Sequence, residues 1–440
     1  MKKALALLTA LTLFAACGGN DSSEGGSSSD APGSSEPAQI ANPAAEYCQQ
    51  RGGTSEVVDE ENGQVGYCNL PDGTRIDEWE YFNAQGVPVD TDLATTVDPD
   101  YAGTVGWFPA VTVGTDGLVI ASQHDRDNGD LKVTHCEDAT CSKATTTMLD
   151  DFAETGLYTS IAIGSDGLPI ISSQNRNKGD LHITHCSNIA CTEAVTTPVD
   201  AEGDVGWDSA IAIGSDGLAV ISHHDNDNGT LRLTHCSNVE CTEATSVVVD
   251  DAAEVGWFTS IAIGSDGLPI IAYQDETNTA LKVAHCSDVT CSSATITTAD
   301  DSGDVGQETA IAIGADGLPI ISHIDYESSA LLVTKCSNVE CTSSTTSKPA
   351  PDRRAGIGSS IVVSGDTALI VHFDADSNAL LVSACGDAKC STSTTSELDP
   401  TPGSGWTSMT IGDSGLPIVS YLSSAVGNLR LVYCKTATCS

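Results

Sequence analysis

The sequence predicts an all-β protein: a seven-bladed β-propeller with four-stranded blades, preceded by a small, disulfide-stapled, β-rich N-terminal domain. Three observations lead to this prediction: a 50-residue period from about residue 100 to the end of the chain, four strand-like runs in each period, and a Cys-x4-Cys pair in each copy. A period of this length with four strands per unit is typical of propeller blades. Seven glycines mark the period, the last of them one residue early: Gly106, Gly156, Gly206, Gly256, Gly306, Gly356 and Gly405.

Residues 1–16 are predicted to form a signal peptide, because two lysines precede an apolar run that is too short to span a bilayer. The run ends in Leu-Phe-Ala-Ala-Cys, which resembles the lipobox of bacterial lipoproteins, with Phe14 where that motif usually has leucine. The resemblance implies cleavage before Cys17 and lipidation of Cys17. We therefore expect a lipid-anchored protein of the cell envelope, in the outer membrane and facing the periplasm or the cell surface, that contacts the membrane through this anchor only. The alternative is an ordinary secretory signal with an incidental cysteine. Residues 17–40 consist mostly of Gly, Ser, Asp and Pro and are expected to form a flexible linker.

Cysteine counting supports export. The 17 cysteines divide into Cys17, one pair within residues 41–84 and seven Cys-x4-Cys pairs, so none is left over once Cys17 is lipidated. Even pairing in an exported chain predicts disulfide bonds. Zinc is the alternative, but each hairpin would supply only two of its four ligands. The predicted bonds are Cys48–Cys68, Cys136–Cys141, Cys186–Cys191, Cys236–Cys241, Cys286–Cys291, Cys336–Cys341, Cys385–Cys390 and Cys434–Cys439.

Residues 41–84 form a separate small domain. They contain, in order, Asn-Pro-Ala-Ala-x-Tyr-Cys, Gly-Gly, Gly-Tyr-Cys, Leu-Pro-Asp-Gly and Glu-Trp-x-Tyr-Phe. This order resembles a small bacterial domain family known as haemolysin-like or as a domain of unknown function. Members often carry a further cysteine after the Pro-Asp-Gly turn, where this chain has Arg75-Ile76. The resemblance implies no catalytic or pore-forming residues. We expect Trp79, Tyr81 and Phe82 to form a miniature core, with a binding surface as the alternative.

One repeat shows the expected blade. Residues 159–164, 168–174, 180–186 and 191–199 are strand-like, with each cysteine pair at the junction of the last two runs. The first two runs are almost continuously apolar, so these strands are expected to be covered on both faces by neighbouring sheets.

The two ends of the array predict how the ring closes. The last copy stops where its fourth strand should begin, and a matching run precedes the first copy. We therefore expect residues 92–98 to supply the outer strand of the last blade, which removes exposed edges and makes residues 92–440 one closed propeller. The alternative is an open solenoid, which would need polar caps at both ends.

Two loops between the second and third strands resemble the Asp-x-Asp-x-Asx-Gly calcium loops of some propellers. Their candidate calcium ligands are Asp125, Asp127, Asp130, Asp225 and Asp227. The alternative is a plain Asx-Gly turn, because the pattern decays in the other copies and no copy shows the distal glutamate of an EF-hand. No cofactor other than calcium is predicted.

Aromatic residues recur after the acidic loops that join one blade to the next. Beside carboxylates at a channel mouth, such rings could stack on sugars or on cationic groups. The alternative is packing between adjacent blades. The candidate ligand-binding residues are Trp107, Tyr158, Trp207, Trp257 and Trp406.

The net charge and the absence of known catalytic motifs exclude some classes of function. With 61 acidic and 18 basic residues the formal charge is -43, which repels nucleic-acid phosphates. The sequence shows no arginine cluster, Gly-x-Ser-x-Gly or His-Glu-x-x-His motif, so no catalytic residue is assigned. We expect a monomeric envelope lipoprotein whose acidic propeller acts as a binding scaffold for an extracellular or periplasmic protein or glycan. The alternatives are an enzyme that acts on glycans or peptidoglycan in the channel mouth, and a haemolysin-like effector that acts through residues 41–84.

Overall fold

The computed structural model divides the chain into two compact units, Met1–Arg75 and Ile76–Ser440. Among the residues that it describes, no helix is both long enough and apolar enough to cross a membrane. The described residues are 45, 48, 53–60, 63–70, 75–78, 89–90, 93–100, 104–149, 154–400, 403–424 and 427–440. The predicted signal peptide, Cys17, the linker and the aromatic residues Trp79, Tyr81 and Phe82 lie outside them.

Near the N-terminus the described residues form a three-stranded sheet in the order β1 (Thr54–Glu60), β2 (Gly63–Asn69) and β3 (Arg75–Asp77). Cys48 and Cys68 form the predicted disulfide bond and are fully buried. A Cβ atom at Gly53 would lie 2.7 Å and 2.8 Å from their two sulfur atoms, so only glycine fits beside the bridge. The Arg75 guanidinium lies 4.0 Å from the centre of the Tyr67 ring, so Arg75 covers an aromatic face where related domains often have a cysteine.

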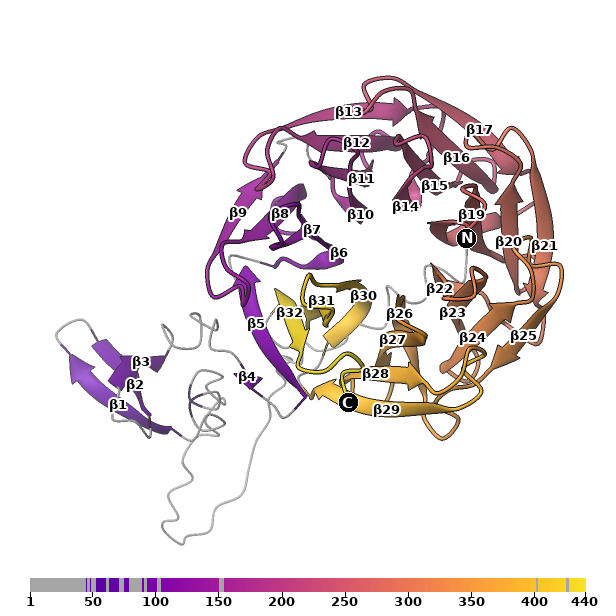
Figure 1. The fold of residues 1–440 in the computed structure, drawn as a ribbon. Helices are drawn as coiled ribbons and strands as arrows, with labels where there is room; N and C mark the ends of the chain where they lie inside the picture. The colour runs from indigo at the N-terminus through magenta and orange to yellow at the C-terminus, as the bar shows by residue number, and fades with distance from the viewer. Residues whose placement is uncertain are drawn as a thin grey trace, which may run out of the picture. The chain divides into compact units, whose positions relative to one another are not determined.

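Within the described residues the large unit contains seven antiparallel sheets, and in each the strands follow one another from the centre of a ring to its rim (Figure 1). The strands of the first six sheets are β6 (Trp107–Val113), β7 (Val119–Asp125), β8 (Asp130–Cys136) and β9 (Ala144–Met148); β10 (Leu157–Ile163), β11 (Pro169–Asn175), β12 (Asp180–Cys186) and β13 (Ala194–Asp200); β14 (Trp207–Ile213), β15 (Ala219–Asp225), β16 (Thr230–Cys236) and β17 (Ala244–Asp250); β18 (Val255–Ile263), β19 (Pro269–Asp275), β20 (Ala280–Cys286) and β21 (Ala294–Asp300); β22 (Gln307–Ile313), β23 (Pro319–Asp325), β24 (Ala330–Cys336) and β25 (Ser344–Ser347); β26 (Ala355–Ser364), β27 (Thr367–Asp374), β28 (Leu380–Cys385) and β29 (Ser393–Asp399). The seventh sheet has the order β30 (Gly403–Ile411), β31 (Pro417–Ser423), β32 (Asn428–Cys434), β5 (Ala94–Asp100) and β4 (Val89–Asp90).

The ring is closed. The inner strands contact one another in the circular order β6, β10, β14, β18, β22, β26, β30 and back to β6. The outer strand of the seventh blade is β5, which precedes the first blade in the sequence and pairs with β32, with Val97 opposite Leu431 and Ala94 opposite Cys434. This strand lies at Ala94–Asp100, two residues later than the sequence placed it, and β4 adds a short fifth strand beside it. The architecture is therefore a seven-bladed propeller.

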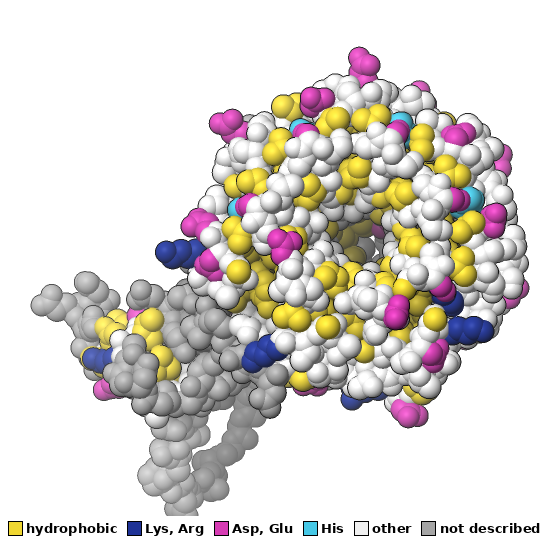
Figure 2. Space-filling model, viewed as in Figure 1, with side chains coloured by type: hydrophobic (Ala, Val, Ile, Leu, Met, Phe, Trp, Pro, Cys, Tyr) yellow, Lys and Arg dark blue, Asp and Glu magenta, His cyan; other side chains and the backbone are white. Residues whose placement is uncertain are grey.

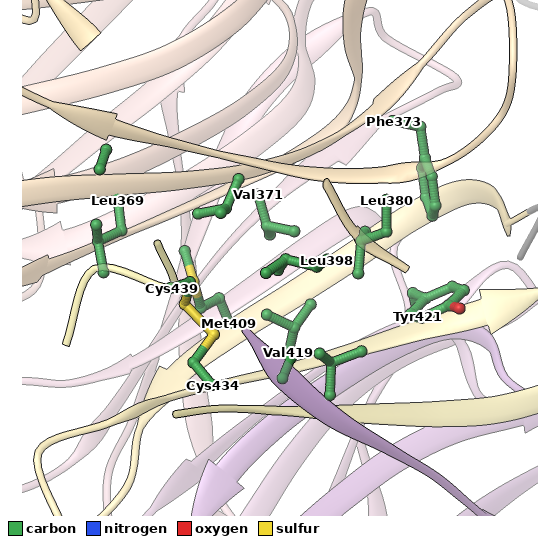
Figure 3. Packing of buried hydrophobic residues seen from close by; sticks show 14 residues of the cluster. Leu369, Val371, Phe373, Leu380, Leu398, Met409, Val419, Tyr421, Cys434 and Cys439 are labelled. Carbon is green, nitrogen blue, oxygen red and sulfur yellow. A yellow bond between two sulfur atoms is a disulfide. The ribbon is translucent and has the colours of Figure 1, made fainter. Parts of the chain in front are cut away.

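Apolar side chains fill the space between neighbouring blades. Figure 3 shows one such layer, in which Val371 and Phe373 of the sixth blade lie opposite Val419 and Tyr421 of the seventh. These side chains are at most 1 % exposed. The core is aliphatic at most junctions, as expected from a chain with 5 % aromatic residues.

The periodic glycine is needed where one blade touches the next. Gly156 has a φ of 76°, and a Cβ atom there would lie 2.7 Å from the Leu131 Cα of the preceding blade. Both the left-handed backbone and the close approach require a residue without a side chain. Four further copies of this glycine, Gly106, Gly206, Gly256 and Gly306, also have positive φ.

All seven predicted Cys-x4-Cys bridges are present in the propeller. The predicted position of the second cysteine was wrong, because the fourth strand begins later than expected. In the second blade, Cys186 ends β12 and faces Ala194, whereas Cys191 lies in the loop with a φ of 52°. The bridge therefore closes a tight turn at the end of the third strand instead of joining two facing strand residues.

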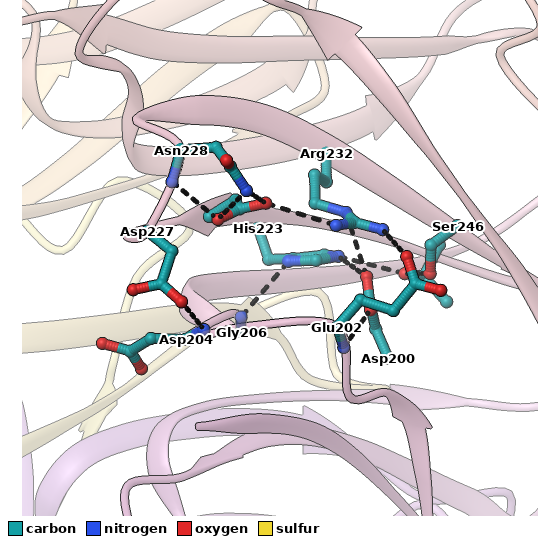
Figure 4. A network of polar contacts seen from close by, with 11 residues as sticks. Asp200, Glu202, Asp204, Gly206, His223, Asp227, Asn228, Arg232 and Ser246 are labelled. Carbon is teal, nitrogen blue, oxygen red and sulfur yellow. Dashed lines mark hydrogen bonds and ion pairs between the residues drawn. The ribbon is translucent and has the colours of Figure 1, made fainter. Parts of the chain in front are cut away.

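Buried ion pairs join consecutive blades at the ends of the outer strands. Asp200, the last residue of β13, lies 3.0 Å from the Arg232 Nε of the next blade, and His223 lies beside them (Figure 4). Burial, reinforced by the Arg232 charge, lowers the pKa of His223 to about 3. The same pairing recurs between Asp100 and Lys132, at 2.9 Å.

Arg430 of β32 carries the corresponding charge at the closing blade. Its Nε and Nη2 donate to the two carboxylate oxygens of Asp98 on β5 at 2.6 Å and 2.7 Å, and its Nη1 lies 3.2 Å from Asp399 of the sixth blade. All three side chains are at most 5 % exposed. Arg430 therefore holds the closing strand and links two blades.

A second interaction between blades uses hydroxyl groups. The Ser222 hydroxyl of β15 lies 2.8 Å from the Thr259 hydroxyl of the next blade, which also donates to the Asp208 carbonyl. Ser420 occupies the same place in the seventh blade, but the next blade has Pro109 there, and the buried Ser420 hydroxyl has no partner among the described residues.

We predict that Arg430→Met lowers the free energy of unfolding by about 3–5 kcal/mol, because it leaves two carboxylates buried without their partner. Arg354→Met is the matched control, since the Arg354–Asp376 pair is more than half exposed and should cost less than about 1 kcal/mol. Equilibrium denaturant unfolding of the full chain measures both. Equal losses would show that Arg430 does not hold the ring closed.

We also predict that two Ser→Ala substitutions at equivalent positions have different effects on the free energy of unfolding. Ser222→Ala should lower the free energy of unfolding by about 1 kcal/mol, because it removes a satisfied buried hydrogen bond. Ser420→Ala should be neutral or stabilising, because it removes a buried hydroxyl that has no partner. Chemical denaturation of the two variants tests this, and a loss at Ser420 equal to that at Ser222 would contradict it.

Candidate functional site: the mouth of the central channel

The inner strand of most blades carries a bulge near its first residues. In the third blade the register of β14 against β15 shifts between Trp207 and Ala210. The residue after Trp207 then adopts a left-handed backbone, which is unfavourable for any residue with a side chain. The bulge residues and their φ values are Phe108 (48°), Tyr158 (52°), Asp208 (50°), Phe258 (53°), Glu308 (52°) and Gly358 (64°).

These bulge residues surround a cavity of about 170 Å³ on the axis of the ring. Each of the seven inner strands contributes its bulge residue and the residue that follows it. A bulge can redirect a side chain, and here it turns one side chain per blade toward the axis. Figure 2 shows the central hollow from one face, bordered mainly by hydrophobic side chains.

Trp406 holds the bulge position in the seventh blade. The Thr407 hydroxyl donates to the carbonyl of Gly358, as the Thr159 hydroxyl donates to the carbonyl of Phe108. The sequence alignment had placed Trp406 level with Trp207, one position earlier. That register was wrong, because the bulge differs: between paired residues β30 advances three residues against one on β31, whereas β14 advances three against two on β15.

One side of the cavity is an aromatic wall. The Phe108 ring centre lies 4.2 Å from that of Trp406 and 4.5 Å from that of Tyr158, and the Phe108 ring is tilted by 48° and 50° to these two rings. Such tilted contacts are favourable for aromatic pairs. The rings come from the seventh, first and second blades, so the wall spans three consecutive inner strands.

The other side carries two carboxylates, Asp208 of the third blade and Glu308 of the fifth. Each accepts a hydrogen bond from the backbone N–H at the bulge of the following blade: Asp208 from Phe258 at 2.8 Å, and Glu308 from Gly358. No described residue donates to the second oxygen of either carboxylate. Burial raises the pKa of Asp208 to about 6, and burial together with the nearby Asp208 charge raises the pKa of Glu308 to about 7.

The five aromatic residues predicted from the sequence do not all reach the cavity. Tyr158 and Trp406 line it, whereas Trp107, Trp207 and Trp257 lie one residue before the bulge. The Trp207 indole donates to Asp204 at 2.8 Å, and its ring centre lies 5.6 Å from that of Tyr158. These tryptophans contact rings of neighbouring blades, as the packing alternative expected. Ligand binding by Tyr158 and Trp406, which line the cavity, stays a prediction.

Sequence reasoning missed Asp208 and Glu308, and from the pairs Trp107-Phe108 and Trp257-Phe258 it selected the tryptophans as candidates instead of the phenylalanines. Spacing alone does not reveal the bulge that turns these side chains inward. One signal was available: the position after the bulge is Thr or Ser in six of the seven copies, whereas the bulge position is occupied in turn by Phe, Tyr, Asp, Phe, Glu, Gly and Trp.

The candidate calcium ligands have other partners in the structure. Asp125 accepts hydrogen bonds from the backbone of Asp127 and Asn128, and Asp127 accepts from the backbone of Thr104. Asp225 accepts from the Asn228 backbone and side chain and lies 3.2 Å from an Arg232 nitrogen, and Asp227 accepts from the Asp204 backbone. Asp130 lies opposite Asp125 in the β7–β8 ladder. Among the described residues the structure gathers no group of three or more His, Cys, Asp and Glu side chains that could hold a metal ion. Calcium binding by these loops stays a prediction.

Residues 39–85 match the family described as "Domain of unknown function (DUF333)", which confirms the resemblance of the small domain. The uncharacterized protein YoaF of Escherichia coli strain K12 is 50% identical over 50 residues, 11% of this chain and 60% of the relative. YoaF of Shigella flexneri matches with the same values. This chain thus spans 60% of the length of the curated relatives that it matches.

Solved structures resemble the propeller. The polysaccharide lyase Uly1 superposes with a TM-score of 0.50 at 10% identity, covering 74% of this chain and 89% of the lyase. Hydrazine synthase of Kuenenia stuttgartiensis superposes with a TM-score of 0.51 at 12% identity, covering 79% and 97%. At these identities the likeness shows a shared fold and nothing about activity.

The raised pKa of Glu308 predicts a pH-dependent stability. Between about pH 4.5 and 7 the folded protein retains a proton at Glu308 that the unfolded chain has lost, so this group lowers the free energy of unfolding as pH rises through that window. Glu308→Gln removes this contribution, and the glutamine oxygen can still accept from Gly358. The melting temperature of the variant, relative to wild type, should therefore increase from pH 5 to pH 8.

The prediction concerns the difference in melting temperature between the variant and the wild type. Buried histidines with a lowered pKa, such as His223, make both proteins more stable as pH rises, and this shared effect cancels in the difference. Glu327→Gln is the control, since Glu327 is exposed on a loop of the same unit. A difference for Glu308→Gln that does not change with pH would contradict the prediction.

Proposed function

We propose that the chain is an envelope lipoprotein whose propeller is a binding scaffold, and that it engages an extracellular or periplasmic partner at the mouth of its central channel. The observation that carries this proposal is the set of bulge residues. Five bulky or acidic side chains occupy left-handed backbone positions that glycine or asparagine would fill at lower cost. Strain kept at five equivalent positions is typical of a site where side-chain identity serves binding.

The envelope location is supported by two features of the sequence and one of the structure. The lipobox-like segment ends at Cys17, and a linker follows it. Eight disulfide bonds in the described residues fit an oxidising compartment. The high negative charge keeps such a scaffold soluble and away from anionic surfaces.

An enzyme that acts on glycans is the second candidate, and the two carboxylates favour it. A raised pKa suits a general acid, and glycoside hydrolysis uses a pair of carboxyl groups. Both carboxylates, however, accept a hydrogen bond from a backbone N–H of the next blade, so they have a structural role as well. The small domain adds a third possibility, a haemolysin-like effector, for which no residue-level support exists in the described part of the chain.

The test is a binding and turnover screen of the full chain against envelope glycans and surface proteins. Saturable binding without turnover is expected, lost in Trp406→Ala and kept in the exposed control Glu327→Gln. Binding that survives Trp406→Ala would contradict a site at the channel mouth. Turnover of a glycan that Glu308→Gln abolishes would establish the enzyme instead.

A further inference from the structure

The channel mouth brings aromatic rings and carboxylates together in one cavity. The aromatic wall of Phe108, Tyr158 and Trp406 faces the same cavity as the carboxylates Asp208 and Glu308. No arginine or lysine is among the residues that line this cavity. The two carboxylates therefore share one cavity with an aromatic wall and with no basic side chain in its lining.

We propose that the channel mouth binds an alkylammonium group, a positively charged nitrogen carried on an apolar stem. This inference rests on the proposed function and names the chemistry of its ligand. The nitrogen would lie between the free oxygens of Asp208 and Glu308, and its alkyl substituents would contact the rings of the aromatic wall. Ring faces attract such cations, and carboxylates strengthen the attraction in a partly dehydrated site.

The geometry fits this group better than the alternatives. A metal ion such as calcium takes six or more oxygen ligands. The cavity offers two carboxylates, and the lining hydroxyls of Thr159, Thr259, Thr309 and Thr407 already donate to backbone carbonyls. An anion would meet two carboxylates and no basic side chain. A neutral sugar could stack on the rings and donate hydroxyl hydrogen bonds to the carboxylates, but it would bring no positive charge to balance them.

Cavity size sets the limit on what enters. A cavity of about 170 Å³ has room for a small head group presented by a larger partner. The formal charge of -43 raises the local concentration of cations around the mouth.

Two sources carry this chemistry: a free quaternary amine of the choline type, and the lysine side chain of a partner protein. Isothermal titration calorimetry of the full chain would use three probes: choline, its uncharged carbon isostere 3,3-dimethyl-1-butanol, and Nα-acetyl-lysine methylamide, whose side-chain ammonium group is free. We expect saturable binding of choline or of the lysine amide, at least about 10-fold tighter than dimethylbutanol. Choline alone would assign a free amine, and the lysine amide alone a protein partner.

The variants identify the groups responsible. Asp208→Asn and Glu308→Gln keep the shape of the site and should each weaken ammonium binding by about 10-fold or more, and Trp406→Ala should do the same through the wall. Glu327→Gln should leave binding unchanged. Circular dichroism of every variant confirms that the propeller is folded.

Equal affinity for choline and dimethylbutanol, or no saturation by either ammonium probe, would overturn this inference. If partner binding in the envelope screen is nevertheless lost in Trp406→Ala, the proposed function stands with a different ligand. If partner binding survives Trp406→Ala, the proposed function fails whatever the amines do.

Discussion

Closure of the ring is the constraint on which the rest of the structure depends. Every blade buries its aliphatic faces against two neighbours, so a ring that stayed open would expose two such faces and the edges of their strands. The chain closes the ring by taking β5 from ahead of the first blade and pairing it with β32. Arg430 then binds Asp98 on β5 and Asp399 of the preceding blade, while Asp100, at the end of the same strand, binds Lys132 of the first blade. Ion pairs of Asp98 and Asp100 therefore bind β5 to residues of both the seventh and the first blade.

The junctions between blades are built from the same parts, and this uniformity makes the exceptions informative. Periodic glycines touch the preceding blade, hydroxyl pairs cross between strands, and a terminal aspartate meets a cation of the next blade. Against this background the bulge position changes from copy to copy, although six of its seven residues share a left-handed backbone. The side chains of Phe, Tyr, Asp and Glu on this backbone are the reason for placing the proposed binding site at the channel mouth.

Periodic features could be read from the sequence, and local deviations from the period could not. The number of blades, the disulfide partners and the origin of the closing strand follow from a repeat that is unbroken over seven copies. The second cysteine of each pair was placed in a strand because hairpin geometry was assumed, whereas a left-handed residue such as Cys191 closes a turn. Trp406 was assigned one position early because the last inner strand has a different bulge. Asp208 and Glu308 were missed because their inward direction depends on a bulge that no spacing rule encodes.

The candidate site is also a product of closure. Asp208 and Glu308 are oriented by N–H groups that belong to the following blades, so neither carboxylate has its position without a neighbour. The aromatic wall crosses the junction between the seventh and first blades, where Trp406 meets Phe108. An open array with the same seven copies would separate that pair and lose the wall. The strand borrowed from ahead of the repeats therefore does more than cover an edge: it creates the one junction at which a tryptophan of the last blade and a phenylalanine of the first can share a cavity with the carboxylates.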